Sequence, residues 1–236
     1  DLILLALLVI FNSENIFTIP LTSLFSKSDI LVPLLTSGEF RDRLKHEIRE
    51  KKEEVMRSRS LEDLVIDGEN ERIGFKSSFW TESGSGEKSL LLQDAVVKEV
   101  AGLLNSDFGG TLLIGVGDEE PFDPTGLVEK DIAHIGSKDK LELHIGNILS
   151  RDLLTDFSAG LWSIRFRPFR GEKIIMINVP KQAPKPVLAY QPNKQKKKQK
   201  NAKEEFRFTR SGSATNPISS STWTSYVLEH WGKSGE

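Results

Sequence analysis

The chain has 236 residues, of which 38% are hydrophobic, which is enough for one domain with a buried core and an appended segment. It contains no cysteine, which excludes disulfides and thiolate metal sites, and its four histidines are too widely separated to suggest a multi-histidine zinc site. The formal net charge of −2 gives the chain as a whole no attraction for polyanions.

The N-terminal region combines an apolar run with a charged helix. The run LILLALLVIF, residues 2–11, is too short for a bilayer, which takes about 20 residues, and it lacks the basic start of a signal peptide. Two interpretations stay open for it: a buried helix or strand, or the end of a membrane segment. Residues 39–59 carry apolar side chains at helical spacing among many charges, which predicts a connecting helix. We assign residues 1–60 to this N-terminal segment.

A strand, a helix and a second strand are predicted after the turn DGEN at residues 67–70. RIGFKSSF (72–79) is expected to form a strand, and SLLLQDAVVKEVAGLLNS (89–106) an amphipathic helix. The loop between them, residues 82–87, is rich in glycine and serine. TLLIGVG (111–117) is apolar on both sides, which is typical of a buried strand.

The second half of the chain alternates hairpins with helices. A helix is predicted at 138–153 and another at 221–231, the first with His144 packed on its apolar side. Strands are predicted at 161–169, 172–180, 187–190 and 204–210. The mixture of hairpins and helices favours an α+β fold, a mixed and largely antiparallel sheet with packed helices, over a doubly wound α/β fold.

The glycines at 109, 110, 115 and 117 do not form a nucleotide-binding loop. A dinucleotide fingerprint needs G-x-G-x-x-G before a helix, and here the second glycine pair is followed by the turn DEEPFDPTG. The chain also has no Gly-Lys-Ser/Thr for a P-loop, so no nucleotide cofactor is expected. The first pair is expected to end a helix, and the second pair to admit a close neighbour, either another strand or a ligand.

Several segments resemble, in the same order, the motifs of the Schlafen AlbA-like domain. AGLLNSDFGGTLLIGVGD (101–118) is similar to the family's central motif, and ENERIGFKSS (69–78) resembles its opening Glu-x4-Glu-Phe-Lys strand. KPV (185–187) and FRFTRSGSATNP (206–217) resemble its closing segments, and YVLEHW resembles the terminal helix of bacterial members. The resemblance covers about residues 69–231 and implies the α+β fold of this domain and a nucleic-acid-binding function.

The resemblance also implies an acidic site at which this chain departs from the family. Schlafen ribonucleases are thought to cut structured RNA with three acids that hold a divalent cation, Mg²⁺ or Mn²⁺. By position the first acid is Glu69, the second falls on Gly74, and the family's Asp pair falls on Gly117 and Asp118. The metal ligands implied are thus Glu69 and Asp118. The catalytic candidates are Glu69, Glu71 as a nearby substitute, Lys76 as the family's lysine, and Asp118.

Charge is concentrated in one segment. Between residues 161 and 210, 14 Lys and Arg face 3 Glu, a net charge of +11, which leaves −13 on the rest of the chain. Such asymmetry indicates a surface that meets a polyanion. For Arg210 a phosphate contact and a structural ion pair both stay open. The candidate nucleic-acid contacts are Lys76, Arg165, Arg167, Lys185, Lys194, Lys196, Lys197, Lys198, Lys200, Arg207 and Arg210.

With two of three acids left, we expect a nucleic-acid-binding domain, for RNA rather than DNA, whose nuclease activity is weak or lost. One alternative is a metal-dependent endoribonuclease acting on tRNA-like or single-stranded RNA. A second is a membrane-associated interaction module, in which residues 2–11 end an anchor and the lysine-rich loop meets anionic lipid. We expect a cytoplasmic protein, tethered to a membrane if the chain is a fragment, and homo-oligomerisation stays open.

Overall fold

The computed structural model describes residues 60–154, 160–180, 182–192 and 203–232. The chain divides into two units, Asp1–Arg59 and Ser60–Glu236, and the described residues all belong to the second. The apolar run and the charged helix predicted for the first unit therefore lie outside the described residues. Within these residues, no helix has the length and apolar character needed to cross a membrane.

Four strands form the first sheet, in the order β1-β2-β5-β4. Their bounds are β1 Ile73–Lys76, β2 Gly110–Ile114, β4 Ser163–Phe169 and β5 Glu172–Val179. β1 and β2 run parallel, as a strand–helix–strand crossover requires, and the other two pairings are antiparallel. β4 and β5 are joined by the two-residue turn Arg170-Gly171, in which both residues have positive φ. β1 and β4 are consequently the edge strands.

The second sheet is entirely antiparallel and has the order β3-β6-β7-β8. It consists of β3 Leu153–Leu154, β6 Leu188–Pro192, β7 Lys203–Ser211 and β8 Ala214–Pro217. The hairpin of β7 and β8 places Arg210 opposite Thr215. This pair becomes important because Arg210 reaches the carbonyls at the start of β1 and Thr215 reaches the carboxylate of Glu99.

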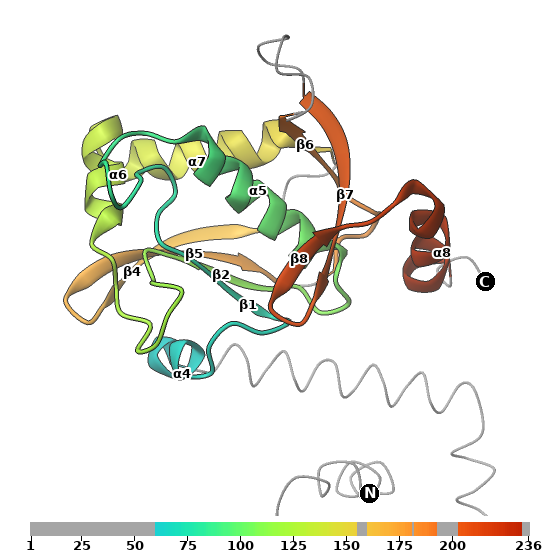
Figure 1. The fold of residues 1–236 in the computed structure, drawn as a ribbon, viewed down its shortest axis with the longest axis horizontal. Coiled ribbons are helices and arrows are strands. Elements are labelled where there is room, and N and C mark those ends of the chain that lie inside the picture. Colours follow the sequence, from blue (N-terminus) through green and yellow to red (C-terminus); the bar gives the residue numbers. More distant parts are fainter. Residues whose placement is uncertain (1–59, 155–159, 181, 193–202, 233–236) are drawn as a thin grey trace, which may run out of the picture. The chain divides into compact units, whose positions relative to one another are not determined.

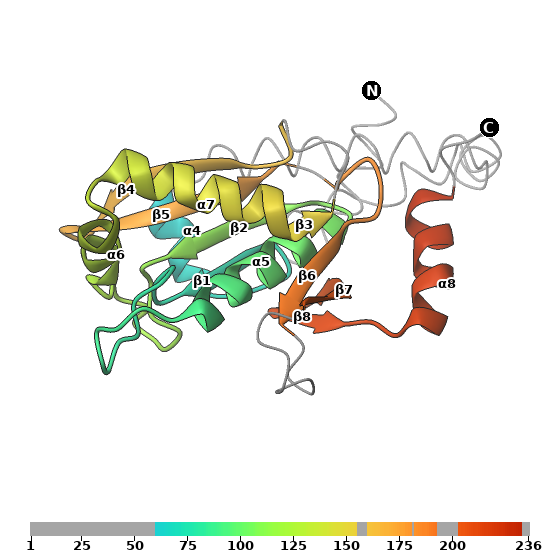
Figure 2. The ribbon, with the colours of Figure 1, turned by 90° about the horizontal axis from the view of Figure 1, so that it is seen from above.

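Helices lie on both faces of the first sheet (Figures 1 and 2). α5 Leu90–Asn105 and α7 Lys138–Asp152 cover one face, and α4 Leu61–Ile66 lies on the other. α6 Leu127–Ile135 precedes α7, and α8 Ser220–Trp231 closes the described chain without a buried residue. The main core forms where aliphatic side chains of α5 and α7 meet those of β2 and β5.

α5 is the central helix because its second half is apolar on nearly every side. Val96, Val100 and Leu104 are fully buried, which ties the helix to the sheet through the hydrophobic effect. It ends at Asn105, whose amide donates to the carbonyls of Val187 and Phe208, both at 2.8 Å. The same side chain that ends the helix therefore connects it to the second sheet.

The α+β prediction is confirmed, while several short elements differ from the sequence analysis. The helices α4 and α6 and the strands β3 and β8 were not predicted. The strand expected to reach residue 117 stops at Ile114, because Gly115 takes a φ of 101°. A Cβ at Gly115 would lie 2.7 Å from Val128 Cγ2 of α6 and 3.3 Å from Ile174 Cγ2 of β5, so the close neighbours at this glycine are a helix and, as expected, a strand.

Candidate nucleic-acid interface

Glu69 lies in the turn before β1 and serves the backbone of that strand. Its Oε1 accepts a hydrogen bond of 2.6 Å from the amide of Phe75. The next residue, Asn70, accepts from the amides of Arg72 and Ile73 and so shapes the entry into β1. Since β1 is an edge strand, the Glu69 carboxylate satisfies an amide that no neighbouring strand pairs.

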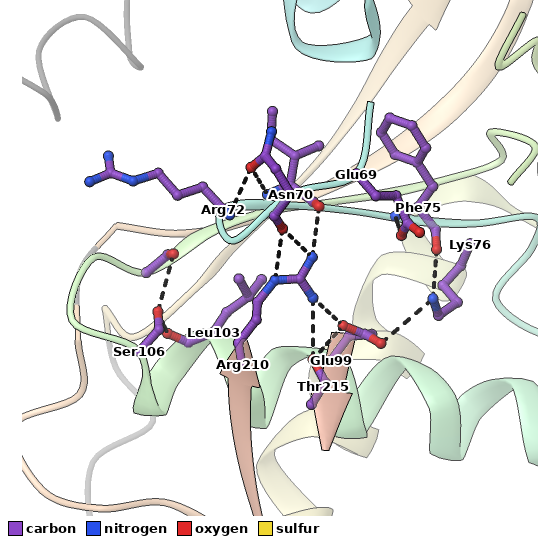
Figure 3. Close-up of polar contacts among 12 residues, drawn as sticks. Glu69, Asn70, Arg72, Phe75, Lys76, Glu99, Leu103, Ser106, Arg210 and Thr215 are labelled. Atoms are coloured by element: carbon purple, nitrogen blue, oxygen red, sulfur yellow. Dashed lines mark hydrogen bonds and ion pairs between the residues drawn. The ribbon is translucent and has the colours of Figure 1, made fainter. Parts of the chain in front are cut away.

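Arg210 is the centre of a buried polar cluster beside β1 (Figure 3). Its side chain is 0% exposed, and Nη1 lies 2.6 Å from Glu99 Oε2 of α5. The guanidinium also donates to the backbone carbonyls of Asn70 and Ile73 and to the hydroxyl of Thr215. This geometry supports the structural interpretation of Arg210, because a side chain buried in this way does not reach a phosphate in solvent.

Gly74 and Lys76 lie on the same side of β1 as this cluster. A Cβ at Gly74 would be in van der Waals contact with Arg210 Nη2 and Leu112 Cδ1, both at 3.4 Å, so the place of the family's second acid faces the Arg210 guanidinium. Lys76 Nζ donates to the carbonyl of Phe75 at 2.7 Å and lies 3.7 Å from Glu99 Oε1. Its side chain is 25% exposed, so it retains contact with solvent.

The remaining acidic candidates do not assemble with Glu69 into a metal-binding group. Glu71 and Asp118 are exposed, and Asp118 begins the turn after Gly117. In the ranges that the structure covers, no three acidic or histidine side chains form a group that could hold a metal ion. Glu99, a carboxylate that the sequence analysis did not consider, is committed to Arg210 and Thr215. The residues present thus do not fit the divalent cation that the resemblance implies.

The basic residues of the first hairpin differ in whether a carboxylate binds them. Arg165 and Arg167 of β4 are exposed on one side of the strand, while Ile164 and Phe166 pack against the core on the other. This alternation was expected for a half-buried strand. Neither arginine forms an ion pair with any residue that the structure describes. In the same hairpin, Arg170 binds Glu62 and Asp123, and Lys173 binds Glu129.

The other basic candidates belong to the second sheet and its loops. Lys185 is exposed. Arg207 of β7 is partly exposed and donates to the hydroxyl of Ser220 at 3.2 Å. The candidates between residues 193 and 202 lie outside the described residues: Lys194, Lys196, Lys197, Lys198 and Lys200.

Asp131 of α6 is a buried carboxylate that the sequence analysis did not single out. It accepts hydrogen bonds from the amides of Phe79, Trp80 and Thr81 and from the Thr81 hydroxyl. Burial raises the pKa of Asp131 above its ordinary value, and the four hydrogen bonds oppose that rise. Its role is to fix the segment after β1, and nothing in the sequence separates it from other helical aspartates.

His144 and Trp80 form a packed aromatic pair between α7 and this segment. Their rings stack with centroids 4.9 Å apart, and Lys88 Nζ lies 4.3 Å from the centroid of the Trp80 ring. Burial, followed by the charges of Arg151 and Lys88, lowers the pKa of His144. The prediction of a packed histidine is confirmed.

Comparisons with known proteins agree with the motifs. The family model described as Schlafen, AlbA_2 matches residues 69–219. No curated protein matches the chain. Among solved structures, the chain is similar to the crystal structure of the DIP2311 protein from Corynebacterium diphtheriae, with 17% identity and a TM-score of 0.45. That match covers 68% of this chain and 24% of the other, so the chain spans about a quarter of the length of that protein.

Proposed function

Since the chain belongs to the Schlafen AlbA_2 family, which indicates a nucleic-acid-binding domain, we propose that it binds RNA and does not cleave it. The observation that supports binding most strongly is the pair Arg165 and Arg167. Both side chains are exposed on one side of β4, and neither is neutralised by a carboxylate of the described residues. Exposed, uncompensated arginines are suited to bidentate contacts with phosphate oxygens.

The proposed contact surface is the exposed side of β4 that carries Arg165 and Arg167. Successive residues of a strand rise about 3.3 Å, so two residues on the same side are roughly 6.6 Å apart along it. An extended nucleic-acid strand can lie along such a row with a phosphate near each guanidinium. Arg170, Lys173 and Arg210 are left out of this surface because carboxylates already bind them.

RNA is proposed over DNA on the basis of the family, whose Schlafen members include ribonucleases that act on structured RNA. Loss of cleavage is proposed on the basis of the acidic positions. The second acid is replaced by Gly74, which faces Arg210, and Glu69 bonds the amide of Phe75. Two carboxylates at most are left for a cation, and Asp118 lies on an exposed turn. Lys76 can still contact a phosphate, because its ammonium group keeps some exposure.

Binding is tested by comparing two double variants at fixed salt. Arg165→Ala/Arg167→Ala should weaken binding of labelled tRNA and of a labelled single-stranded RNA on the order of tenfold, because each phosphate contact carries a charge-assisted hydrogen bond. The matched control, Lys130→Ala/Lys140→Ala, removes the same charge from exposed lysines of α6 and α7. Equal loss in both variants would show an effect of net charge alone and would contradict the proposed surface.

Cleavage is tested with the same labelled RNAs, incubated with the full chain in Mn²⁺, in Mg²⁺ or in chelator. The proposal expects intact RNA under all three conditions. Cleavage that needs the cation and is lost in both Glu69→Ala and Asp118→Ala would instead establish the metal-dependent endoribonuclease. Cleavage that persists unchanged in both variants would indicate a contaminating nuclease.

A further inference from the structure

An open groove of about 530 Å³ lies between helix α7 and the edge strand β4. Its lining includes Asp139, Glu142 and Leu143 of α7, together with Trp162, which precedes β4, and Ile164 of β4. Leu143 is 65% exposed, and Trp162 and Ile164 are half-buried, so the groove offers apolar surface to a neighbour.

The charges of this groove are opposite to those of the nucleic-acid surface. Asp139 and Glu142 stand four and one residues before Leu143 on α7, and neither forms an ion pair with a residue that the structure describes. Carboxylates without an ion pair among the described residues attract cationic groups, and Lys138 brings a positive charge toward β4, with its Nζ 5.4 Å from the centroid of the Phe166 ring. The groove is therefore distinct from the surface of Arg165 and Arg167 and does not depend on the RNA-binding proposal.

The outer edge of β4 has unpaired backbone groups. Phe169 and Glu172 flank a two-residue turn, so they form a hydrogen-bonded pair, and the pairs along the hairpin then alternate. By this alternation the amides and carbonyls of Ile164 and Phe166 point away from β5. Pro168 shares this orientation, which suits a residue without an N–H group. No backbone group of the described ranges binds Ile164 or Phe166 from outside the hairpin.

We propose that β4 and α7 form a docking site for an extended basic segment of a partner protein. The segment adds to the edge of β4 as a further strand, with main-chain hydrogen bonds to Ile164 and Phe166. Every second side chain of an added strand points toward α7, so cationic side chains reach Asp139 and Glu142 and an apolar one covers Leu143. The chain's own segment 193–202, NKQKKKQKNA, supplies cations but no large apolar residue, which favours a partner protein as the occupant.

The test uses a labelled peptide, Thr-Lys-Thr-Leu-Thr-Lys-Thr, which presents two cations and one apolar side chain on the same side of a strand. Fluorescence anisotropy with the full chain should show saturable binding. Asp139→Lys/Glu142→Lys should weaken it at least about tenfold, because attraction becomes repulsion at both positions. The matched control, Glu119→Lys/Glu120→Lys, makes the same charge change on an exposed turn and should leave the Kd within about twofold.

Strand addition is tested separately from charge. Two further peptides are N-methylated at alternate residues, one at the even and the other at the odd positions. In an added strand, every second N–H group faces β4, so at least one of the two peptides lacks the donors that bind β4 and should lose binding. Circular dichroism and thermal unfolding confirm that each protein variant is folded.

Four results would overturn the proposal. These are no binding at about 1 mM peptide, equal binding of the acidic peptide Thr-Glu-Thr-Leu-Thr-Glu-Thr, full binding of both methylated peptides, and equal weakening in the control variant. Self-association of the chain that the Asp139→Lys/Glu142→Lys change abolishes would also overturn it, because the occupant would then be a second copy.

Discussion

Substitution of Arg210 by methionine keeps most of the side chain's volume and removes its guanidinium. In the folded chain this group is 0% exposed and pairs with Glu99, which is 8% exposed. The variant leaves the Glu99 carboxylate inside the fold with two partners, the Thr215 hydroxyl at 2.7 Å and the Lys76 ammonium at 3.7 Å. It also removes the donors to the carbonyls of Asn70 and Ile73.

The expected cost follows from that geometry. Removing one partner of a buried ion pair destabilises a protein by about 3–5 kcal/mol. Because Lys76 and Thr215 still serve Glu99, we expect the lower end, about 3 kcal/mol. With an m-value of about 2 kcal/mol/M, the urea midpoint should fall by roughly 1.5 M.

Urea unfolding followed by circular dichroism measures this change. Arg207→Met is the matched control, because Arg207 is partly exposed and bonds only Ser220 among the described residues, and its midpoint should barely move. The double variant Arg210→Met/Glu99→Met should be less destabilised than the sum of the single variants, since it leaves no buried charge. A loss below about 1 kcal/mol for Arg210→Met would show that the guanidinium is not held in the interior, and the reasoning would fail.

Three further changes probe other parts of the fold. Gly102→Ala should cost about 1–3 kcal/mol, because its Cβ would lie 2.6 Å from Thr215 Cγ2, whereas Gly84→Ala, with no neighbour within 4 Å, should leave the urea midpoint unchanged. Asp131→Asn should cost about 1–3 kcal/mol in the same measurement, since an amide cannot accept from all three backbone N–H groups and the hydroxyl that the carboxylate serves. The pKa of His144 is lowered in the folded state, so His144 contributes its full stabilisation above the pKa of the unfolded histidine, and this contribution declines as the pH falls toward the folded pKa. His144→Gln should therefore flatten the pH dependence of the unfolding free energy between those two pKa values.

The larger elements could be predicted because each carries its own signal. Helix α5 is recognisable by its amphipathic spacing, β2 by its apolar run, and the β4–β5 hairpin by Arg170-Gly171 between two apolar strands. α4, α6, β3 and β8 have at most nine residues each. Elements so short depend on the surfaces against which they pack, and those surfaces are distant in the sequence.

The sequence predicts which basic residues belong to the candidate site, but not which acidic residues bind them. Arg210 and Glu99 are 111 residues apart, so nothing local reveals that they bind each other. Glu99 has the pattern of an ordinary helical glutamate, although it lies in the interior beside Arg210. Conversely, Arg165 and Arg167 could be placed on one side of a strand from alternation alone, because that property depends only on neighbouring residues.

The salt dependence of RNA affinity tests the central claim most directly. The Kd of the full chain for a labelled single-stranded RNA is measured between about 50 and 300 mM salt, in the wild type and in Arg165→Ala/Arg167→Ala. We predict that log Kd rises linearly with log salt and that the double variant has a slope lower by about 1.4, because each lost contact with a single strand releases about 0.7 fewer counterions. An affinity that does not change with salt, or the same slope in both proteins, would contradict RNA binding through this pair of arginines.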